Sequence, residues 1–206
     1  EIVRMPLACT ALARRIYDAA NSDLPPALPT RAEGDPAAMQ ADVDTAYLDA
    51  GLFYDFLQAK FARDGLDGMG APLKCVVRYC TGDPSDACPY VNAFWSIDRA
   101  YFGDGFAVAD DVVGHELAHG ITASESGLVY FGQPGAINEA FSDIFGEFFD
   151  LQDGVGNDAP AEAGLIGEDV PGLGAFRDMA DPTQFQDADA TCSANWYDGP
   201  LDGGGI

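Results

Sequence analysis

The sequence has few positive charges and no long apolar run. Of its 206 residues only 10 are lysine or arginine, against 34 aspartate or glutamate, giving a formal net charge of −24. Such a chain repels phosphate backbones and anionic lipid headgroups, so we expect neither nucleic acid nor a membrane as a partner. No segment approaches the roughly 20 apolar residues that a membrane span requires. The excess of carboxylates is typical of a solvated surface, or of acidic clusters that bind calcium.

Cysteine is also scarce, and none of the five cysteines forms a CxxC pair, which disfavours a zinc knuckle or a thioredoxin-like motif. Cys80 and Cys88 flank a turn-rich loop that a disulfide could close. The odd number leaves one thiol free or paired outside this chain, and oxidising surroundings are favoured. A basic segment followed by an apolar stretch is missing at the N-terminus. The start at Glu1 fits a mature, extracellular protein whose signal and pro-segment have been removed.

What is present suffices for a folded core, with 48% hydrophobic and 11% aromatic residues. Apolar residues recur at helical spacing over residues 41–62, and Gly65 lies just beyond, where a helix end is expected. Residues 73–79 and 93–97 are β-rich and predict two strands. Prolines break the first 36 residues into short elements.

Two more helices are expected in the middle of the chain. Asp110 and Asp111 form an N-terminal signal for a helix that ends near Glu125. Pro134 breaks the chain, and a second helix follows over about 136–151 with a strongly apolar face. A mixed start followed by long helices predicts the α+β class.

The only two histidines of the chain lie in His115-Glu116-Leu117-Ala118-His119. Residues four apart share one face of a helix, with Cβ atoms about 5–6 Å apart, so both imidazoles can reach one metal ion. Glu116 lies one step further round, where it can act on a water molecule at the metal instead of binding the ion. The segment therefore predicts a catalytic zinc site.

A catalytic zinc needs a third protein ligand and an open position. Glu125 lies six residues past His119, where the metzincin pattern would place a histidine, but Thr122 stands where that pattern requires glycine. Glu139 and Asp143 are four apart on the next helix, whose other residues are mostly apolar, which favours an inward role for both. We therefore expect Glu139 to bind zinc and Asp143 to orient a ligand imidazole.

These motifs resemble the thermolysin-like zinc metalloproteases, also called neutral proteases or gluzincins. The resemblance depends on His-Glu-Leu-Ala-His, nineteen intervening residues, and Glu139 within Gly-Ala-Ile-Asn-Glu-Ala-Phe-Ser-Asp. Further matching blocks are Asn92-Ala93-Phe94-Trp95, Gly103-Asp104-Gly105, Gly167-Glu168-Asp169 and the segment around Arg177.

The resemblance covers about residues 42–206, whereas the first forty residues match only loosely. It implies a thermolysin-like zincin of the α+β class. Residues 1–133 would form a sheet-rich N-terminal domain that ends in the zinc-binding helix. Residues 134–206 would form the first, incomplete part of a helical C-terminal domain.

The resemblance also implies catalytic and substrate-binding roles. Glu116 would be the general base, Tyr130 would hydrogen-bond the tetrahedral oxyanion, and Arg177 would grip a substrate carbonyl. Asn92 and the backbone of Ala93 would align an extended peptide. Four apolar residues fall where the family lines its primed-side pocket and imply a bulky apolar residue after the cut: Val112, Ile166, Val170 and Phe176.

A paired calcium site beside the active centre is implied as well. Three acidic residues match its ligands: Asp111, Asp150 and Glu168. The following loop is longer than the family pattern, and three further residues could each complete the shell: Asp153, Asp158 and Glu162. Asp158 is the candidate we place with the first three, so zinc and calcium are the expected cofactors.

The sequence stops at Ile206, just before the position where the family has a histidine that stabilises the transition state. Asp202 matches the partner that orients this histidine. We expect the rest of the helical domain on a second polypeptide, or omitted from this sequence, and proteins or peptides as substrates. Two other readings are weaker. A zinc aminopeptidase would need an anchor for a free α-amino group, and an inactive remnant would be expected to lose Glu116.

Overall fold

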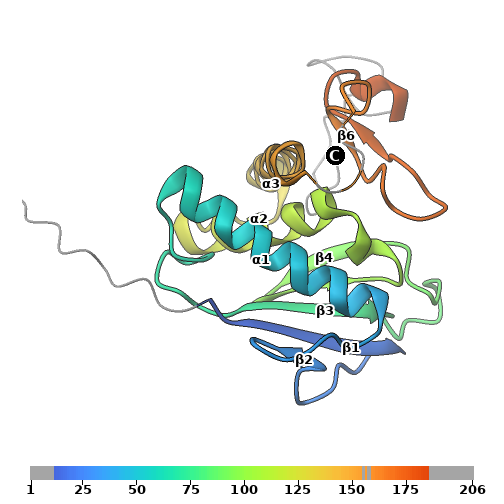
Figure 1. Ribbon diagram of the computed structural model, residues 1–206. Coiled ribbons are helices and arrows are strands. Elements are labelled where there is room, and N and C mark those ends of the chain that lie inside the picture. The colour runs from blue at the N-terminus through green and yellow to red at the C-terminus, as the bar shows by residue number, and fades with distance from the viewer. Residues whose placement is uncertain (1–11, 155, 157–158, 186–206) are drawn as a thin grey trace, which may run out of the picture.

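The computed structural model describes residues 12–154, 156 and 159–185 (Figure 1). The main sheet has five strands in the order β2-β1-β3-β5-β4. Their bounds are β1 Arg14–Ser22, β2 Arg31–Ala32, β3 Leu73–Tyr79, β4 Ala93–Ser96 and β5 Arg99–Phe102. The three central strands are parallel, and the edge strands β2 and β4 run antiparallel to their neighbours.

The α-helices lie on one side of this sheet, with α3 farther from it than α1 (Figure 1). The helical segments are α1 Ala41–Phe61, η1 Phe106–Val108, α2 Asp110–Glu125, α3 Gly132–Asp153 and η2 Pro182–Phe185. A small second sheet pairs β6 Leu165–Ile166 with β7 Arg177–Asp178. The α+β class predicted from the sequence is confirmed.

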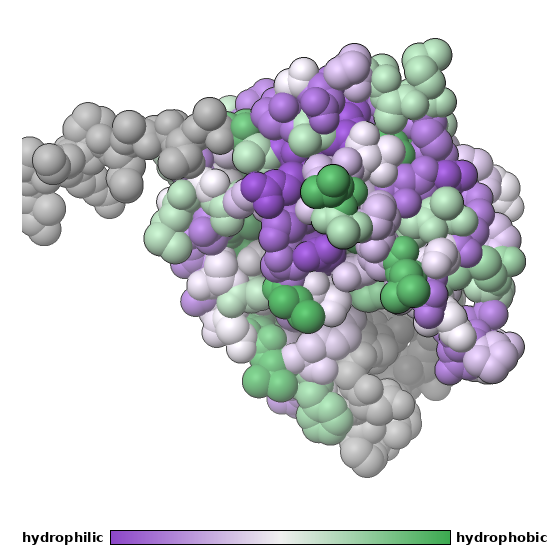
Figure 2. Space-filling model, turned by 90° about the horizontal axis from the view of Figure 1, so that it is seen from below, coloured by the Kyte–Doolittle hydropathy of each residue, from purple (hydrophilic) through white to green (hydrophobic). Residues whose placement is uncertain are grey.

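The core fills the space between the sheet and the helices. Phe53 and Leu57 of α1, Val77 of β3, Leu117 of α2 and Phe149 of α3 are all at most 1% exposed. On the face shown in Figure 2, strongly hydrophobic residues stand singly among hydrophilic ones. In the described part of the chain, no helix is both long and apolar enough to cross a membrane.

The predicted helices and strands are present, but their ends differ in instructive ways. The left-handed residue that ends α1 is Ala62 (φ 51°), not Gly65. Asp111 lies within the first turn of α2 and not before it. In the first turn, a carboxylate interacts favourably with the positive end of the helix dipole. Pro134 does not break the chain before α3. It lies in the first turn of that helix, where its missing N–H would have no partner in any case.

The sequence reasoning missed β1, β2 and β5. Tyr17 to Asn21 of β1 carries no strict alternation, and Ala20 and Asn21 adopt positive φ where the pairing register shifts. β2 has only two residues and is held by pairing with β1. These strands form through tertiary pairing, which a local pattern does not report.

Candidate active site

Two glycines let α2 and α3 approach closely. A Cβ atom on Gly146 would lie 2.5 Å from the carbonyl oxygen of Asp111, and one on Gly114 would lie 3.0 Å from Gly146 Cα. With no side chain at this crossing, His115, which directly follows Gly114, can contact Asp143 and Glu139, which lie about one and two turns before Gly146. The His-Glu-Leu-Ala-His segment of α2 therefore lies against the acidic face of α3.

Three side chains converge at this contact. His115 Nε2 and His119 Nε2 are 3.1 Å apart. Glu139 Oε2 lies 3.4 Å from His115 Nε2, and Glu139 Oε1 lies 3.3 Å from His119 Nε2. All three residues are at most 8% exposed.

This donor set fits a zinc ion. Two imidazole nitrogens and one carboxylate are the ligand types that a catalytic zinc takes from a protein, with a fourth position left open. Among the described residues, a group of potential metal ligands close enough to hold one ion is formed by His115, Glu116 and His119. Glu139, the third ligand expected from the sequence, faces both imidazoles. The alternative, Glu125, instead pairs with Arg63 at 2.5 Å.

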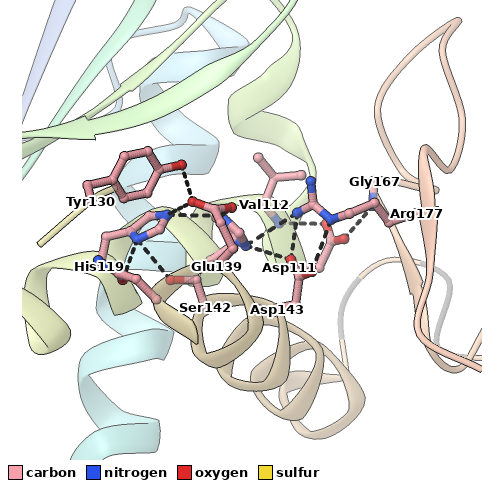
Figure 3. Close-up of polar contacts among 11 residues, drawn as sticks. Asp111, Val112, His119, Tyr130, Glu139, Ser142, Asp143, Gly167 and Arg177 are labelled. Atoms are coloured by element: carbon pink, nitrogen blue, oxygen red, sulfur yellow. Dashed lines mark hydrogen bonds and ion pairs between the residues drawn. The ribbon is translucent and has the colours of Figure 1, made fainter. Parts of the chain in front are cut away.

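The far side of each imidazole is held by α3. His115 Nδ1–H donates to Asp143 Oδ1 at 2.8 Å, as expected. His119 Nδ1–H donates to Asn138 Oδ1 at 2.9 Å, and Ser142 Oγ lies 3.1 Å from the same nitrogen (Figure 3). With the proton on Nδ1, the tautomer that these acceptors favour, Nε2 of each ring would be free to bind a metal ion.

Asn138 and Ser142 were missed by the sequence reasoning. A detectable signal existed, because Asn138, Ser142, Glu139 and Asp143 follow the i, i+3, i+4 spacing of one helical face.

Glu116 lies beside the three converging side chains, with a carboxylate oxygen within 4.8 Å of a ring nitrogen of both His115 and His119. It is 4% exposed, and its Oε2 has no hydrogen-bond partner among the described residues. Burial raises the pKa of Glu116 to about 7, and the nearby Glu139 carboxylate adds to the increase while His115 opposes it. A bare carboxylate with this pKa can accept a proton near neutral pH.

Arg177 reaches the site from β7 and forms a bidentate pair with Asp143 (Figure 3). Its Nε donates to Asp143 Oδ2 at 3.0 Å, and its Nη2 donates to Asp143 Oδ1 at 2.5 Å. The Tyr130 hydroxyl donates to Glu139 Oε1, and burial together with this carboxylate raises the pKa of Tyr130. The structure thus brings both residues to the site, where each contacts a side chain of α3.

A cavity of about 570 Å³ opens over these groups. Ala93 at the start of β4 and the preceding Asn92 line it, as do Val112, Ile166 and Phe176 from the expected primed-side set. Val170 is the member of that set that does not line the cavity. It is 4% exposed and packs in the main core.

A second acidic cluster includes the first turn of α2 and the last turn of α3. Asp111 is fully buried, and its Oδ2 accepts the Gly167 N–H at 2.5 Å. Burial raises the pKa of Asp111 to about 6 and that of Glu168 to about 8, with Asp111 adding to the latter. Asp150 is 2% exposed and hydrogen-bonds Asp110, a residue that the sequence reasoning treated only as a helix signal.

Two predicted residues, Asp158 and Asp202, lie outside the described part of the chain. The structure therefore gives no position for the fourth calcium candidate or for the expected orienting aspartate.

The α+β fold, with two imidazoles and the Glu139 carboxylate converging beside Glu116, is that of a metallopeptidase. Comparison with known proteins identifies the family. Residues 17–123 match the thermolysin metallopeptidase catalytic domain, and residues 126–206 match the thermolysin metallopeptidase alpha-helical domain. The chain belongs to the thermolysin metallopeptidase family.

Its relatives include a zinc metalloproteinase of Renibacterium salmoninarum, 40% identical over 179 residues, which span 82% of this chain and 32% of the relative. An extracellular metalloprotease of Pectobacterium carotovorum is 44% identical over 140 residues, which span 65% of this chain and 38% of the relative. The solved precursor of protealysin, a metalloproteinase from Serratia proteamaculans, is 39% identical with a TM-score of 0.69, covering 83% of this chain and 54% of that one. The chain spans about a third of the length of these curated relatives.

Proposed function

We propose that the protein is a secreted zinc-dependent endopeptidase. The observation that carries the proposal is the convergence of His115, His119 and Glu139 beside a buried glutamate that has a bare oxygen, Glu116. The Cys80–Cys88 disulfide supports an oxidising, extracellular setting. So does the similarity to the extracellular metalloprotease of Pectobacterium carotovorum.

His115, His119 and Glu139 would hold the zinc ion. When bound, zinc supplies Lewis-acid polarisation of the substrate carbonyl and lowers the pKa of water. Glu116 takes the proton from the attacking water and later delivers it to the leaving amine. Asp143 and Asn138 keep the two imidazoles in the tautomer that presents Nε2.

Two further groups act on the substrate. The Tyr130 hydroxyl lines the cavity and would donate, in place of its bond to Glu139 Oε1, to the oxygen that becomes negatively charged in the transition state. Arg177, held by Asp143, offers its remaining N–H groups to a substrate carbonyl. An extended peptide would add to the edge of β4, which pairs with β5 along its other edge.

The experiment that tests this function compares Glu116→Gln with a matched control on the same helix, Glu125→Gln. We expect Glu116→Gln to retain one equivalent of zinc and to lose peptide cleavage by about 10³-fold or more, because the proton acceptor is gone. Glu125→Gln removes an ion pair with Arg63 and should leave both zinc content and cleavage near the wild-type values. Turnover at the wild-type rate in Glu116→Gln would refute the assigned role.

The lining of the cavity supports a preference for a bulky apolar residue just after the cut. Val112, Ile166 and Phe176 present hydrocarbon there. Peptides with Leu or Phe at that position should exceed the corresponding Gly or Asp peptides in kcat/KM by about tenfold or more, as expected when a hydrophobic pocket is filled. Equal kcat/KM values across such a series would contradict the pocket assignment.

Calcium is the second proposed cofactor, and its proposed ligands are Asp111, Asp150, Glu168 and Asp158. Asp111 and Asp150 support the proposal because both are buried carboxylates, and carboxylate oxygens are the ligands that calcium takes. We also propose the division into an N-terminal domain, residues 1–133, and a helical part, residues 134–206. Further helices of that part, on the same or a second polypeptide, would cover the apolar side of α3.

A further inference from the structure

A disulfide-closed loop lies between the main sheet and the edge of the cavity. The loop joins β3 to β4, and the Cys80–Cys88 bond closes it with a Cα–Cα distance of 5.6 Å. Every residue over 82–89 is exposed, whereas Cys80 is 4% exposed at the end of β3. Because the loop buries so little surface, we infer that the disulfide holds its returning arm, residues 88–92, against the end of β3.

The returning arm is fixed a second time immediately after the disulfide. The Tyr90 ring packs edge-on against Tyr79 and Phe94, with ring centroids 6.4 and 6.3 Å away. The Tyr90 carbonyl oxygen lies 1.7 Å from where a Cβ on Gly103 would be, and the Gly103 N–H donates to Asn92 O at 2.9 Å. Only glycine at position 103 allows this close approach of the two backbones.

The arm ends at the cleft. Asn92 and Ala93 line the same cavity as His115 and Glu116, and Ala93 begins β4 in register with Phe102. The disulfide and Tyr90 precede Asn92 in the chain, so both constrain the position of this edge.

We propose that the Cys80–Cys88 disulfide and Tyr90 are positioning groups that set the affinity of the cleft edge for extended peptides. The proposal rests on the proposed function, because it assigns the β4 edge to peptide binding. An edge strand binds a peptide through successive backbone hydrogen bonds, so its benefit grows with the length of peptide that lies along it. Loosening the edge costs an extended peptide several contacts and a minimal peptide almost none.

The test measures binding by calorimetry to the full-length, zinc-loaded protein carrying Glu116→Gln, so that no peptide is consumed. Two blocked peptides share the same central pair of residues, and one is longer by three residues on each side. In Cys80→Ser/Cys88→Ser, we expect the dissociation constant of the long peptide to rise about tenfold and that of the short peptide to change less than about twofold. The control Ser85→Ala lies in the same loop, keeps the disulfide, and should bind both peptides as before.

An unchanged dissociation constant for the long peptide, or equal weakening of both peptides, would overturn the proposal. If the double serine variant does not retain zinc, Tyr90→Ala decides the matter, since it keeps the disulfide and should produce the same selective loss. A protein with Glu116 intact that binds both peptides but cleaves neither would refute the proteolytic function and leave the positioning role standing.

Discussion

At the scale of single residues, Glu116 and Glu139 have identical side chains, but their surroundings shift the two pKa values in opposite directions. Both are buried, and burial raises the pKa of each. At Glu139 the two imidazoles and the Tyr130 hydroxyl outweigh burial, and its pKa is lowered. At Glu116 burial dominates, and its pKa rises to about 7. Glu139 is thus suited to remain an anionic ligand, and Glu116 is suited to exchange a proton.

Asn138 is expected to matter more than Ser142 for metal binding. Its carboxamide oxygen accepts the His119 Nδ1–H at 2.9 Å, and Asn138 and His119 are at most 7% exposed. Asn138→Ala should weaken zinc binding about 10–100-fold, because the ring loses the partner that fixes its tautomer and orientation. Ser142→Ala keeps that partner and should weaken zinc binding less. Competition with a chromophoric chelator measures both constants, and a larger loss in Ser142→Ala would reverse this assignment.

At the scale of elements, α3 turns its polar side inward. Its buried polar and charged residues are Asn138, Glu139, Ser142, Asp143, Glu147 and Asp150. Buried polar groups are costly unless they have partners, and here the partners are the imidazoles of α2, the guanidinium of Arg177 and backbone N–H groups. The apolar side, which the sequence predicts for this helix, is about half exposed in the described structure.

The stability of the start of α2, which carries Asp111, and of the end of α3, which carries Asp150, is expected to depend on calcium. Binding of calcium by these buried carboxylates would stabilise the folded state by mass action, by about 2.7 kcal/mol at a calcium concentration one hundred times Kd. In zinc-saturated protein, calcium should therefore raise the Tm, and Asp111→Asn should abolish the increase. Asp86→Asn, an exposed acidic residue of the disulfide loop, is the matched control. A Tm that calcium does not change in the unsubstituted protein would rule out this site.

At the scale of the whole molecule, the apolar side of α3 forms a stripe along the helix. Its members are 42–49% exposed: Ile137, Phe141, Ile144, Phe148 and Leu151. A contiguous apolar surface of this kind marks an interaction site on a soluble protein. It supports the proposal that further helices pack there.

In the full-length protein, Phe141→Gln and Ile144→Gln should each lower the free energy of unfolding by about 1.5–3 kcal/mol, the value of burying such a side chain. Leu48→Gln, a 56% exposed position on α1, should change it by less than about 0.5 kcal/mol. Chemical denaturation measures all three variants. Stripe variants as stable as the control would show that this surface stays in solvent.

The sequence by itself determined the helices, the two strands β3 and β4, and the expectation that His115, His119 and Glu139 converge, which the structure shows. These features depend on local periodicity and on motif spacing, which are complete within the chain. The tertiary structure decided the strands β1, β2 and β5, whose pairing is non-local, and the roles of Asn138 and Ser142. It also placed Val170 in the core and Asp150 beside Asp110. The partners of Asn138 and Ser142 depend on the close crossing of α2 and α3 at Gly114 and Gly146. A local sequence pattern does not give the distance between two helices.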